Sequence, residues 1–278
     1  MREGRWISIV LLSFNRGIVV EACKVLSKDR TQPNSVVAGR AVSDLDDSTF
    51  FEFNVMPDAG KLEALAEFAA GAGHEINNPL ATIIGRAQLL LKDERDPQRR
   101  QMLQTIGAQA YRIRDMIGDT MLFGRPPAPE LTRVGLRQTV ESVIAKQTED
   151  LTNERCHVEL VISEDIALRA DSTQLSIVLY ELIRNSRNAL QPQGGKIQIV
   201  ALEECGQAVI EVTDEGKGFN ETERQHAFDP FFSGRQASRG LGFGLSKCWR
   251  IVDQHGGRIA IRSKPAGPTT VKIRWPVW

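Results

Sequence analysis

The stretch GHEINNPL, residues 73–80, gathers side chains that could carry out group transfer within about two helical turns. Neutral imidazole is a nucleophile near neutral pH when a neighbouring carboxylate orients its other ring N–H or accepts that proton. His74 and Glu75 supply this pair, and Asn78 follows His74 by one helical turn on the same face. Taken alone, the cluster is better explained as a solvated polar face; the second half of the chain reverses that preference.

An apolar stripe at spacings of three and four residues predicts one long amphipathic helix around this cluster. The stripe consists of Leu62, Leu65, Ala69, Ala72, Ile76, Ile83, Ala87 and Leu90. His74 lies two residues from Ala72 and from Ile76, so we expect its side chain to face solvent. Pro79 lacks the N–H that would bond the carbonyl of Glu75, so we expect a kinked or loosened helix beside the histidine.

A second helix is predicted after Asp96, which suits an N-cap, and Pro97, which suits a first helical turn. Its apolar stripe consists of Leu103, Ile106, Ala110, Ile113, Ile117 and Thr120 or Met121. The two helices predict an antiparallel hairpin over residues 59–124, ended by Gly124 and the prolines that follow. A single hairpin leaves half of its stripe uncovered, so we expect a homodimer with a four-helix bundle.

Two glycine-rich runs in the second half of the chain are suited to binding phosphate. VTDEGKGF places Asp214 at the end of a predicted strand with Gly216 and Gly218 after it, and RGLGFGLSK places further glycines before a predicted helix. These glycines are Gly240, Gly242 and Gly244. Glycine lets the backbone approach a ligand, and a helix N-terminus favours anions. Either run alone is a weak signal.

The segment ELIRNS strengthens the prediction of a nucleotide site. Glu181, Asn185 and Asn188 recur at one helical face, where their oxygens could face a hydrated magnesium ion. A solvated polar face explains Asn188 nearly as well, but explains Glu181 and Asn185 less well because apolar residues flank them.

Residues 130–278 predict an α+β domain with an antiparallel-leaning sheet. Helices are expected at residues 136–145 and 172–190, and strands at 156–162, 196–202, 208–213, 258–263 and 270–275. Residues 1–58 form a short N-terminal region of unknown role.

The order of these motifs resembles that of two-component sensor histidine kinases from about residue 60 to residue 278. GHEINNPL is similar to the H box of that family, YELIRNSRNAL to its N box, and DEGKG, FDPFF and GLGFGL to its G1, F and G2 boxes. The resemblance is to the soluble, nitrogen-regulation-like class. It implies a HisKA-type hairpin followed by an α/β-sandwich ATP-binding domain of the GHKL type.

The resemblance also implies roles for the residues of the hairpin. His74 would be the phosphoacceptor, Glu75 would handle its proton, and Asn78 would position water when the kinase dephosphorylates its partner. The phosphoryl group would pass to an aspartate in the receiver domain of a response regulator.

In the second half, the resemblance implies a site for ATP and Mg²⁺. Asp214 would bond the adenine amino group, and Asn185 would ligate the metal with support from Glu181 and Asn188. Gly216, Gly218 and Gly240 would belong to the glycine boxes, Gly242 and Gly244 would face the phosphates, and Phe231 and Phe232 would anchor a lid between residues 220 and 240.

Glu181 stands where these kinases often carry asparagine, so two other functions stay open. One is a stand-alone ATPase of the chaperone and topoisomerase type, in which such a glutamate activates water. The other is an ATP-binding dimeric scaffold, which would need no nucleophile at position 74. The choice between phosphorylation within one chain and across the dimer also stays open.

Composition limits the partners. Thirty-five basic and 35 acidic residues give no net charge, so we expect no nucleic-acid binding. The longest apolar run, residues 7–12, is too short to span a bilayer, so we expect a cytoplasmic protein. Four scattered cysteines predict reduced packing residues rather than disulfides or zinc ligands.

Overall fold

A computed structural model of the chain describes residues 51–52, 59–162, 166–232 and 242–278. The N-terminal region of unknown role, residues 1–58, lies outside these residues except for Phe51 and Glu52. Among the described helices, none carries an apolar stretch of the kind that a bilayer crossing needs.

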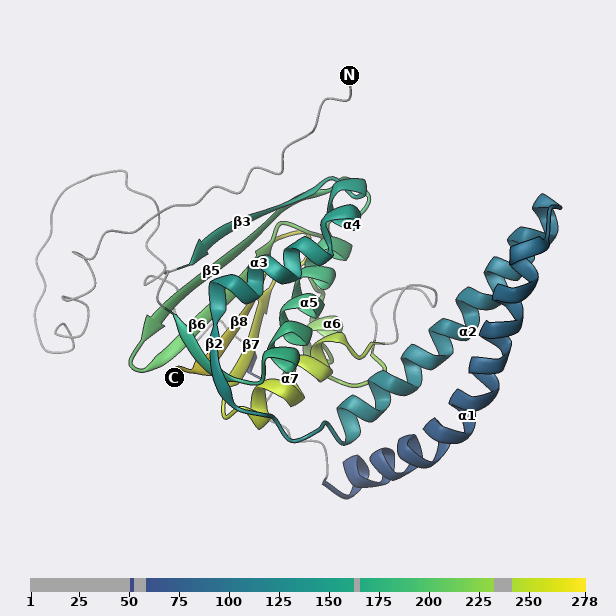
Figure 1. Cartoon of the computed structure of the whole chain (residues 1–278). Coiled ribbons are helices and arrows are strands. Elements are labelled where there is room, and N and C mark those ends of the chain that lie inside the picture. Colours follow the sequence, from purple (N-terminus) through teal and green to yellow (C-terminus); the bar gives the residue numbers. More distant parts are fainter. Residues whose placement is uncertain (1–50, 53–58, 163–165, 233–241) are drawn as a thin grey trace, which may run out of the picture.

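The first half is a hairpin of two long helices, α1 (Ala59–Asp93) and α2 (Pro97–Gly124), which extends away from the rest of the molecule (Figure 1). Asp96 caps α2, because its carboxylate accepts the Arg99 N–H at 2.9 Å. The Arg100 guanidinium closes the turn by donating to the carbonyls of Leu91 and Glu94 at 2.9 and 2.7 Å. Helix α1 continues through Pro79 without a break.

The hairpin buries a narrower face than the predicted stripe. Leu80 and Ile84, which lie outside that stripe, are buried together with Ala87 and Ala110. Four members of the predicted stripe are exposed instead: Ile83, Leu90, Ile106 and Ile113. The exposed members agree with the prediction that one hairpin leaves half of its stripe uncovered, whereas the burial of Leu80 and Ile84 was not predicted.

The second half is built on a six-stranded mixed sheet in the order β1-β7-β8-β6-β5-β3. Its strands are β1 (Phe51–Glu52), β3 (Cys156–Ile162), β5 (Gly195–Glu204), β6 (Gln207–Asp214), β7 (Arg258–Ser263) and β8 (Thr269–Pro276). Strand β3 pairs with β5 in parallel, and the other pairs are antiparallel. The short strands β2 (Thr132–Gly135) and β4 (Ala167–Ala170) form a separate pair. The α+β class with an antiparallel-leaning sheet is confirmed.

Helices cover one face of this sheet (Figure 1). They include α3 (Leu136–Lys146), α4 (Thr148–Asn153), α5 (Ser172–Ala189) and α7 (Gly244–Gln254), while the short α6 (Glu221–Gln225) lies near the lower end of α5. Alternate residues of the strands point into the core, as Val158, Leu160 and Ile162 do in β3. Such alternation, or a continuous apolar run, is what predicted β3, β5, β6, β7 and β8 from the sequence.

The two halves share one core at their junction. Phe123, in the last turn of α2, is 1% exposed and belongs to the main core of the second half. Its ring lies 6.0 Å from that of Phe243. The proline-rich connection is also anchored, because the Gln174 amide donates to the Pro127 carbonyl at 2.9 Å. The end of the hairpin therefore lies directly beside the start of α7.

Candidate nucleotide-binding site

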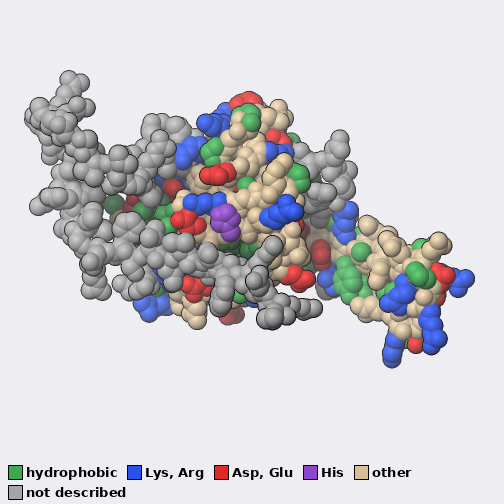
Figure 2. Space-filling model, turned by 90° about the horizontal axis from the view of Figure 1, so that it is seen from above, with side chains coloured by type: hydrophobic (Ala, Val, Ile, Leu, Met, Phe, Trp, Pro, Cys, Tyr) green, Lys and Arg blue, Asp and Glu red, His purple; other side chains and the backbone are tan. Residues whose placement is uncertain are grey.

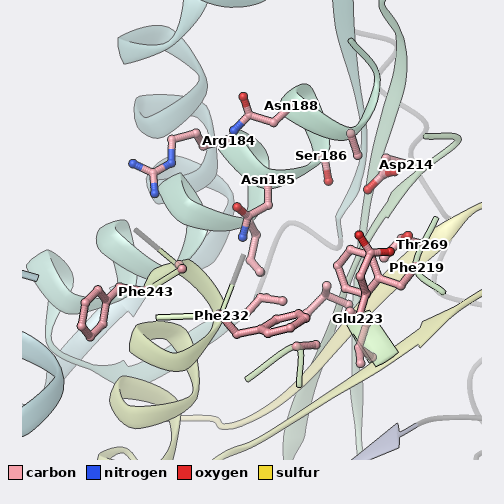
Figure 3. A pocket seen from close by; sticks show the side chains of 18 of the residues that line it. Arg184, Asn185, Ser186, Asn188, Asp214, Phe219, Glu223, Phe232, Phe243 and Thr269 are labelled. Carbon is pink, nitrogen blue, oxygen red and sulfur yellow. The ribbon is translucent and has the colours of Figure 1, made fainter. Parts of the chain in front are cut away.

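A pocket opens between α5, the start of α7, and the strands β6, β7 and β8 (Figure 3). One wall is polar and comes from α5 and the end of β6. The other is apolar and includes Phe219, Phe232, Ile261 and Val271. A pocket that combines an apolar slot with convergent polar groups is suited to a planar base that carries phosphates.

Asp214, the last residue of β6, lines the pocket. It is 4% exposed, and its carboxylate accepts the Gly216 N–H at 3.0 Å. Thr269 lies opposite it in the register of β6 with β8, and both side chains border the pocket (Figure 3). A buried carboxylate beside a hydroxyl provides hydrogen-bonding groups for an exocyclic amine.

The glycines after Asp214 shape the turn instead of lining the pocket. Gly218 adopts φ +65°, and a Cβ there would overlap the carbonyl oxygen of Lys264. The next residue, Phe219, is anchored because its N–H donates to the Ser263 hydroxyl at 2.9 Å. Gly216 and Gly218 thus act through backbone geometry, which holds Phe219 against the pocket.

Helix α5 supplies the polar wall. Asn185 and Asn188 line the pocket, whereas Glu181 lies behind them and is 3% exposed. A Cβ on Gly244 would lie 3.1 Å from Asn185 Nδ2 and 3.2 Å from Glu181 Oε2. The start of α7 is therefore packed against these side chains, and a larger residue at position 244 would displace them.

Both oxygens of Glu181 are held by cations. Arg184 contacts Oε2, and Lys247 Nζ lies 2.9 Å from Oε1. Lys247 also lies 2.5 Å from the carboxylate of Asp119 on α2. Burial lowers the pKa of Lys247, but the two carboxylates outweigh burial and raise its pKa above the ordinary value. Lys247 is therefore a buried ammonium between two anions.

The N-terminus of α7 borders the pocket and fits an anionic ligand. No side chain caps this helix, although its N-cap residue Phe243 and its first residue Gly244 both line the pocket. First-turn N–H groups have no partner within a helix, and they bind phosphate readily. Gly242 precedes them with φ +74°, and a Cβ there would overlap the Phe232 carbonyl oxygen.

The two predicted phenylalanines occupy different places. Phe232 lines the pocket, while Phe231 is 59% exposed and adopts φ +65°. The ring of Phe231 meets that of Phe243 edge-on at 4.6 Å. Gly240 lies outside the described residues, as does most of the second half of the predicted lid.

On the hairpin, the backbone of His74 belongs to α1, but its side chain lies outside the described residues. Glu75 and Asn78 are exposed. Gly73 is buried against α2, and a Cβ there would lie 3.0 Å from Met121 Sδ and 3.3 Å from Ile117 Cγ2. The stretch of α1 that carries His74 therefore lies beside the stretch of α2 that carries Asp119.

The pocket contains residues that the sequence did not single out. Arg184, Phe219, Thr269 and Asp119 all line it. Arg184 stands within ELIRNS and could have been chosen from that motif. Thr269 and Asp119 carried no signal, because strand register brings the first to the site and helix docking brings the second.

Two protein families match the chain. Residues 64–129 match the His Kinase A (phospho-acceptor) domain, and residues 170–278 match the histidine kinase-, DNA gyrase B-, and HSP90-like ATPase.

The chain is 31% identical over 227 residues to the sensory histidine kinase/phosphatase NtrB of Salmonella typhimurium, covering 77% of this chain and 63% of that protein. It is 30% identical over 224 residues to the signal transduction histidine-protein kinase AtoS of Escherichia coli, and the match covers 80% of this chain and 36% of that protein. The chain thus spans less than two thirds of the length of these relatives.

Two solved structures are similar in fold. Full-length ShkA in complex with AMPPNP aligns with a TM-score of 0.67 at 20% identity, covering 76% of this chain and 46% of that one. The histidine kinase ThkA in complex with the response regulator protein TrrA aligns with a TM-score of 0.56 at 24% identity, and the match covers 78% of this chain and 63% of that one. Both share the arrangement of a helical hairpin followed by an α/β sandwich.

Proposed function

Because this chain belongs to the two-component sensor histidine kinases, we propose that it transfers the γ-phosphoryl group of ATP to His74 and then to an aspartate of a response regulator. One observation carries the proposal. Asp119 of the hairpin lines the nucleotide pocket, and Ile117 and Met121 beside it contact Gly73, the neighbour of His74. The pocket and the candidate phosphoacceptor His74 thus lie at the same height along the axis of the hairpin.

The chain's own residues suit binding of the nucleotide. Asp214 and Thr269 would bond the base, Phe219 and Phe232 would cover it, and the first turn of α7 would face the phosphates. Magnesium, when bound, neutralises phosphate charge; Asn185 would hold it, with Asn188 and Glu181 alongside. The amide oxygens of Asn185 and Asn188 on α5 suit the metal, and the uncapped N-terminus of α7 suits the phosphates.

The proposed first step is attack of a neutral imidazole nitrogen of His74 on the γ-phosphorus. The bond between the γ-phosphorus and the bridging oxygen breaks, ADP leaves, and the proton of the other ring nitrogen passes to Glu75 or to solvent. The rate would rest mainly on holding the two reactants in line. In the second step the phosphoryl group leaves the histidine for a carboxylate of the regulator.

The exposed face of α1 supports a protein partner for the second step. Glu75 and Asn78 are both exposed, so a receiver domain could reach this face of the hairpin. We infer that Asn78 orients water when the same face removes phosphate from the regulator. The ThkA structure, a histidine kinase in complex with a response regulator, supports a partner of this class.

We also infer a homodimer through the hairpin. Large apolar side chains of α1 and α2 are exposed in one chain, and Figure 2 shows hydrophobic side chains on the hairpin surface among charged ones. A second copy would bury this stripe in a four-helix bundle. Since ATP is an intracellular substrate, the proposed reaction implies a cytoplasmic location for these residues.

Incubation with γ-labelled ATP tests the function. The unaltered chain should acquire acid-labile, alkali-stable label, and His74→Gln should lose it while still binding AMPPNP. His157→Gln, which alters an exposed histidine on β3, is the matched control and should be labelled normally. Inorganic phosphate released without labelled protein would favour the stand-alone ATPase. Binding without either product would favour the scaffold.

A further inference from the structure

The side chain of Lys247 joins the two halves of the molecule. It is 6% exposed, and its Nζ lies 2.5 Å from Asp119 Oδ1 on α2 and 2.9 Å from Glu181 Oε1 on α5. Glu181 is 4% exposed and Asp119 is 25% exposed at the side chain. Buried charges persist where partners satisfy them, and a buried ion pair is sensitive to the distance between its members.

Both anions of this triad belong to the nucleotide site. Asp119 lines the pocket, and Glu181 lies against the first residue of α7, where a Cβ on Gly244 would approach it to 3.2 Å. Arg184, a pocket residue, holds the remaining oxygen of Glu181. A shift of α2 relative to α7 must therefore either break a buried ion pair or move Lys247 and the Glu181 carboxylate with it.

An apolar contact lies beside the triad. Phe123 of α2 packs on Phe243, and Phe243 packs on Phe231. Contacts between aromatic rings are favourable in several arrangements, offset-stacked as well as edge-to-face, so they do not fix a single relative position. An ion pair at 2.5 Å fixes one position. The aromatic contact buries apolar surface between α2 and α7, and the Lys247 triad fixes the position of the hairpin relative to the nucleotide pocket.

We propose that Lys247 is a positioning residue for the phosphoryl transfer. Asp119 holds it from the hairpin and Glu181 holds it from the pocket wall, so that the triad sets the distance and orientation between the nucleotide pocket and the helix pair that carries His74. This inference rests on the proposed function. Positioning through the Asp119–Lys247 pair acts on the rate of reaction in the bound complex more than on the affinity for nucleotide.

Asp119→Asn tests the proposal because it removes the hairpin charge and keeps both the side-chain shape and the Lys247–Glu181 pair. The initial rate of autophosphorylation at saturating ATP should fall by about tenfold to a hundredfold, the cost of a misplaced reactant. The dissociation constant for AMPPNP with magnesium should change by a much smaller factor than the rate, although Asp119 borders the pocket. Asp119→Glu, which restores a carboxylate, should recover part of the rate.

Two further variants sharpen the test. Asp115→Asn removes an exposed carboxylate one turn earlier on α2, which pairs with Arg114 at 3.1 Å, and should leave the rate unchanged. Lys247→Met removes both bonds of the triad beside the pocket wall, so it should weaken AMPPNP binding as well as the rate. An unchanged rate in Asp119→Asn, or a matched loss of rate and AMPPNP affinity in that variant, overturns the proposal.

Hydrogen exchange separates this inference from the proposed function. Amides of residues 117–124 report docking without any phosphorylation, and they should exchange faster in Asp119→Asn than in Asp115→Asn. If the unaltered chain takes up no label, the proposed function fails, and faster exchange in Asp119→Asn alone still supports the role of Lys247 in docking. Equal exchange in the two variants overturns that role whatever the labelling shows.

Discussion

Gly73 of α1 lies directly against Met121 of α2, so that a Cβ at position 73 would approach the Met121 sulfur to 3.0 Å. This close approach brings the two helices together beside the candidate phosphoacceptor. A substitution here therefore probes the hairpin at the level of His74.

Gly73→Ala should fail to gain the stability that alanine usually brings to a helix. Its methyl group must displace the Met121 side chain and Ile117, which offsets a propensity gain of about 1 kcal/mol. Gly85→Ala in the same helix meets nothing within 4 Å and should raise the thermal midpoint. Thermal unfolding followed by circular dichroism compares the two; an equal rise in both would contradict the close contact.

Asp214→Ala should abolish high-affinity binding of ATP. Loss of a buried carboxylate that hydrogen-bonds the ligand costs on the order of 1.5–3 kcal/mol, or tenfold or more in the dissociation constant. Glu215→Ala alters the neighbouring exposed carboxylate and should bind normally. Titration calorimetry with AMPPNP measures both, and normal affinity in Asp214→Ala would remove this residue from the site.

Gly242→Ala should weaken both folding and nucleotide binding. The φ of +74° alone costs an alanine about 1 kcal/mol, and the methyl group would also overlap the carbonyl of Phe232 in the pocket. Gly206→Ala is the matched control, because Gly206 has φ +77° with no atom within 4 Å. It should show only the backbone cost. Urea denaturation and AMPPNP titration of both variants separate strain from overlap.

Acidification should destabilise the second half through His255. Its Nε2 accepts the Asp171 N–H at 3.1 Å and its Nδ1 donates to the Ile251 carbonyl at 2.8 Å, which suits the neutral ring. Burial lowers the pKa of His255, against a smaller raising effect of that carbonyl and of the Asp171 carboxylate. At a pH below the ordinary histidine pKa of about 6.5, the unfolded chain binds a proton at His255 that the folded chain does not bind.

The stability that His255 contributes is thus present above about pH 6.5 and is lost as the pH falls through the lowered folded value. Replacing His255 by Gln should flatten the pH dependence of the thermal midpoint in this acidic window. His157→Gln, at an exposed position, should leave the dependence as it was. A slope that survives in His255→Gln would assign the effect to other groups.

Ile113→Glu should convert the proposed dimer to a monomer. Ile113 is 42% exposed in one chain, and burial of a carboxylate in a four-helix core without a partner is unfavourable. Gln104→Glu adds the same charge on the opposite face of α2 and should remain dimeric. Sedimentation at several concentrations gives the oligomeric state. A dimer that persists in Ile113→Glu would place the interface elsewhere.

Local patterns were enough to predict the hairpin and most of the sheet. Asp96 and Pro97 start α2 because a capping carboxylate and a proline act within one helical turn. The alternation in β3 and the glycines around Asp214 also act over short distances. The same local signals led to the pocket residues Asn185, Asn188 and Asp214, since each motif lies within a single element or turn.

Tertiary structure decided what depends on contacts between distant segments. No local pattern marked Thr269 or Asp119 as a pocket residue. Strand pairing brings Thr269 beside Asp214, and docking of α2 brings Asp119 beside Lys247. The sequence also presented Glu181 as a polar residue of the pocket wall, whereas Lys247 and Arg184 hold both of its oxygens. Charge partners far apart in sequence are set by packing, and no local periodicity encodes them.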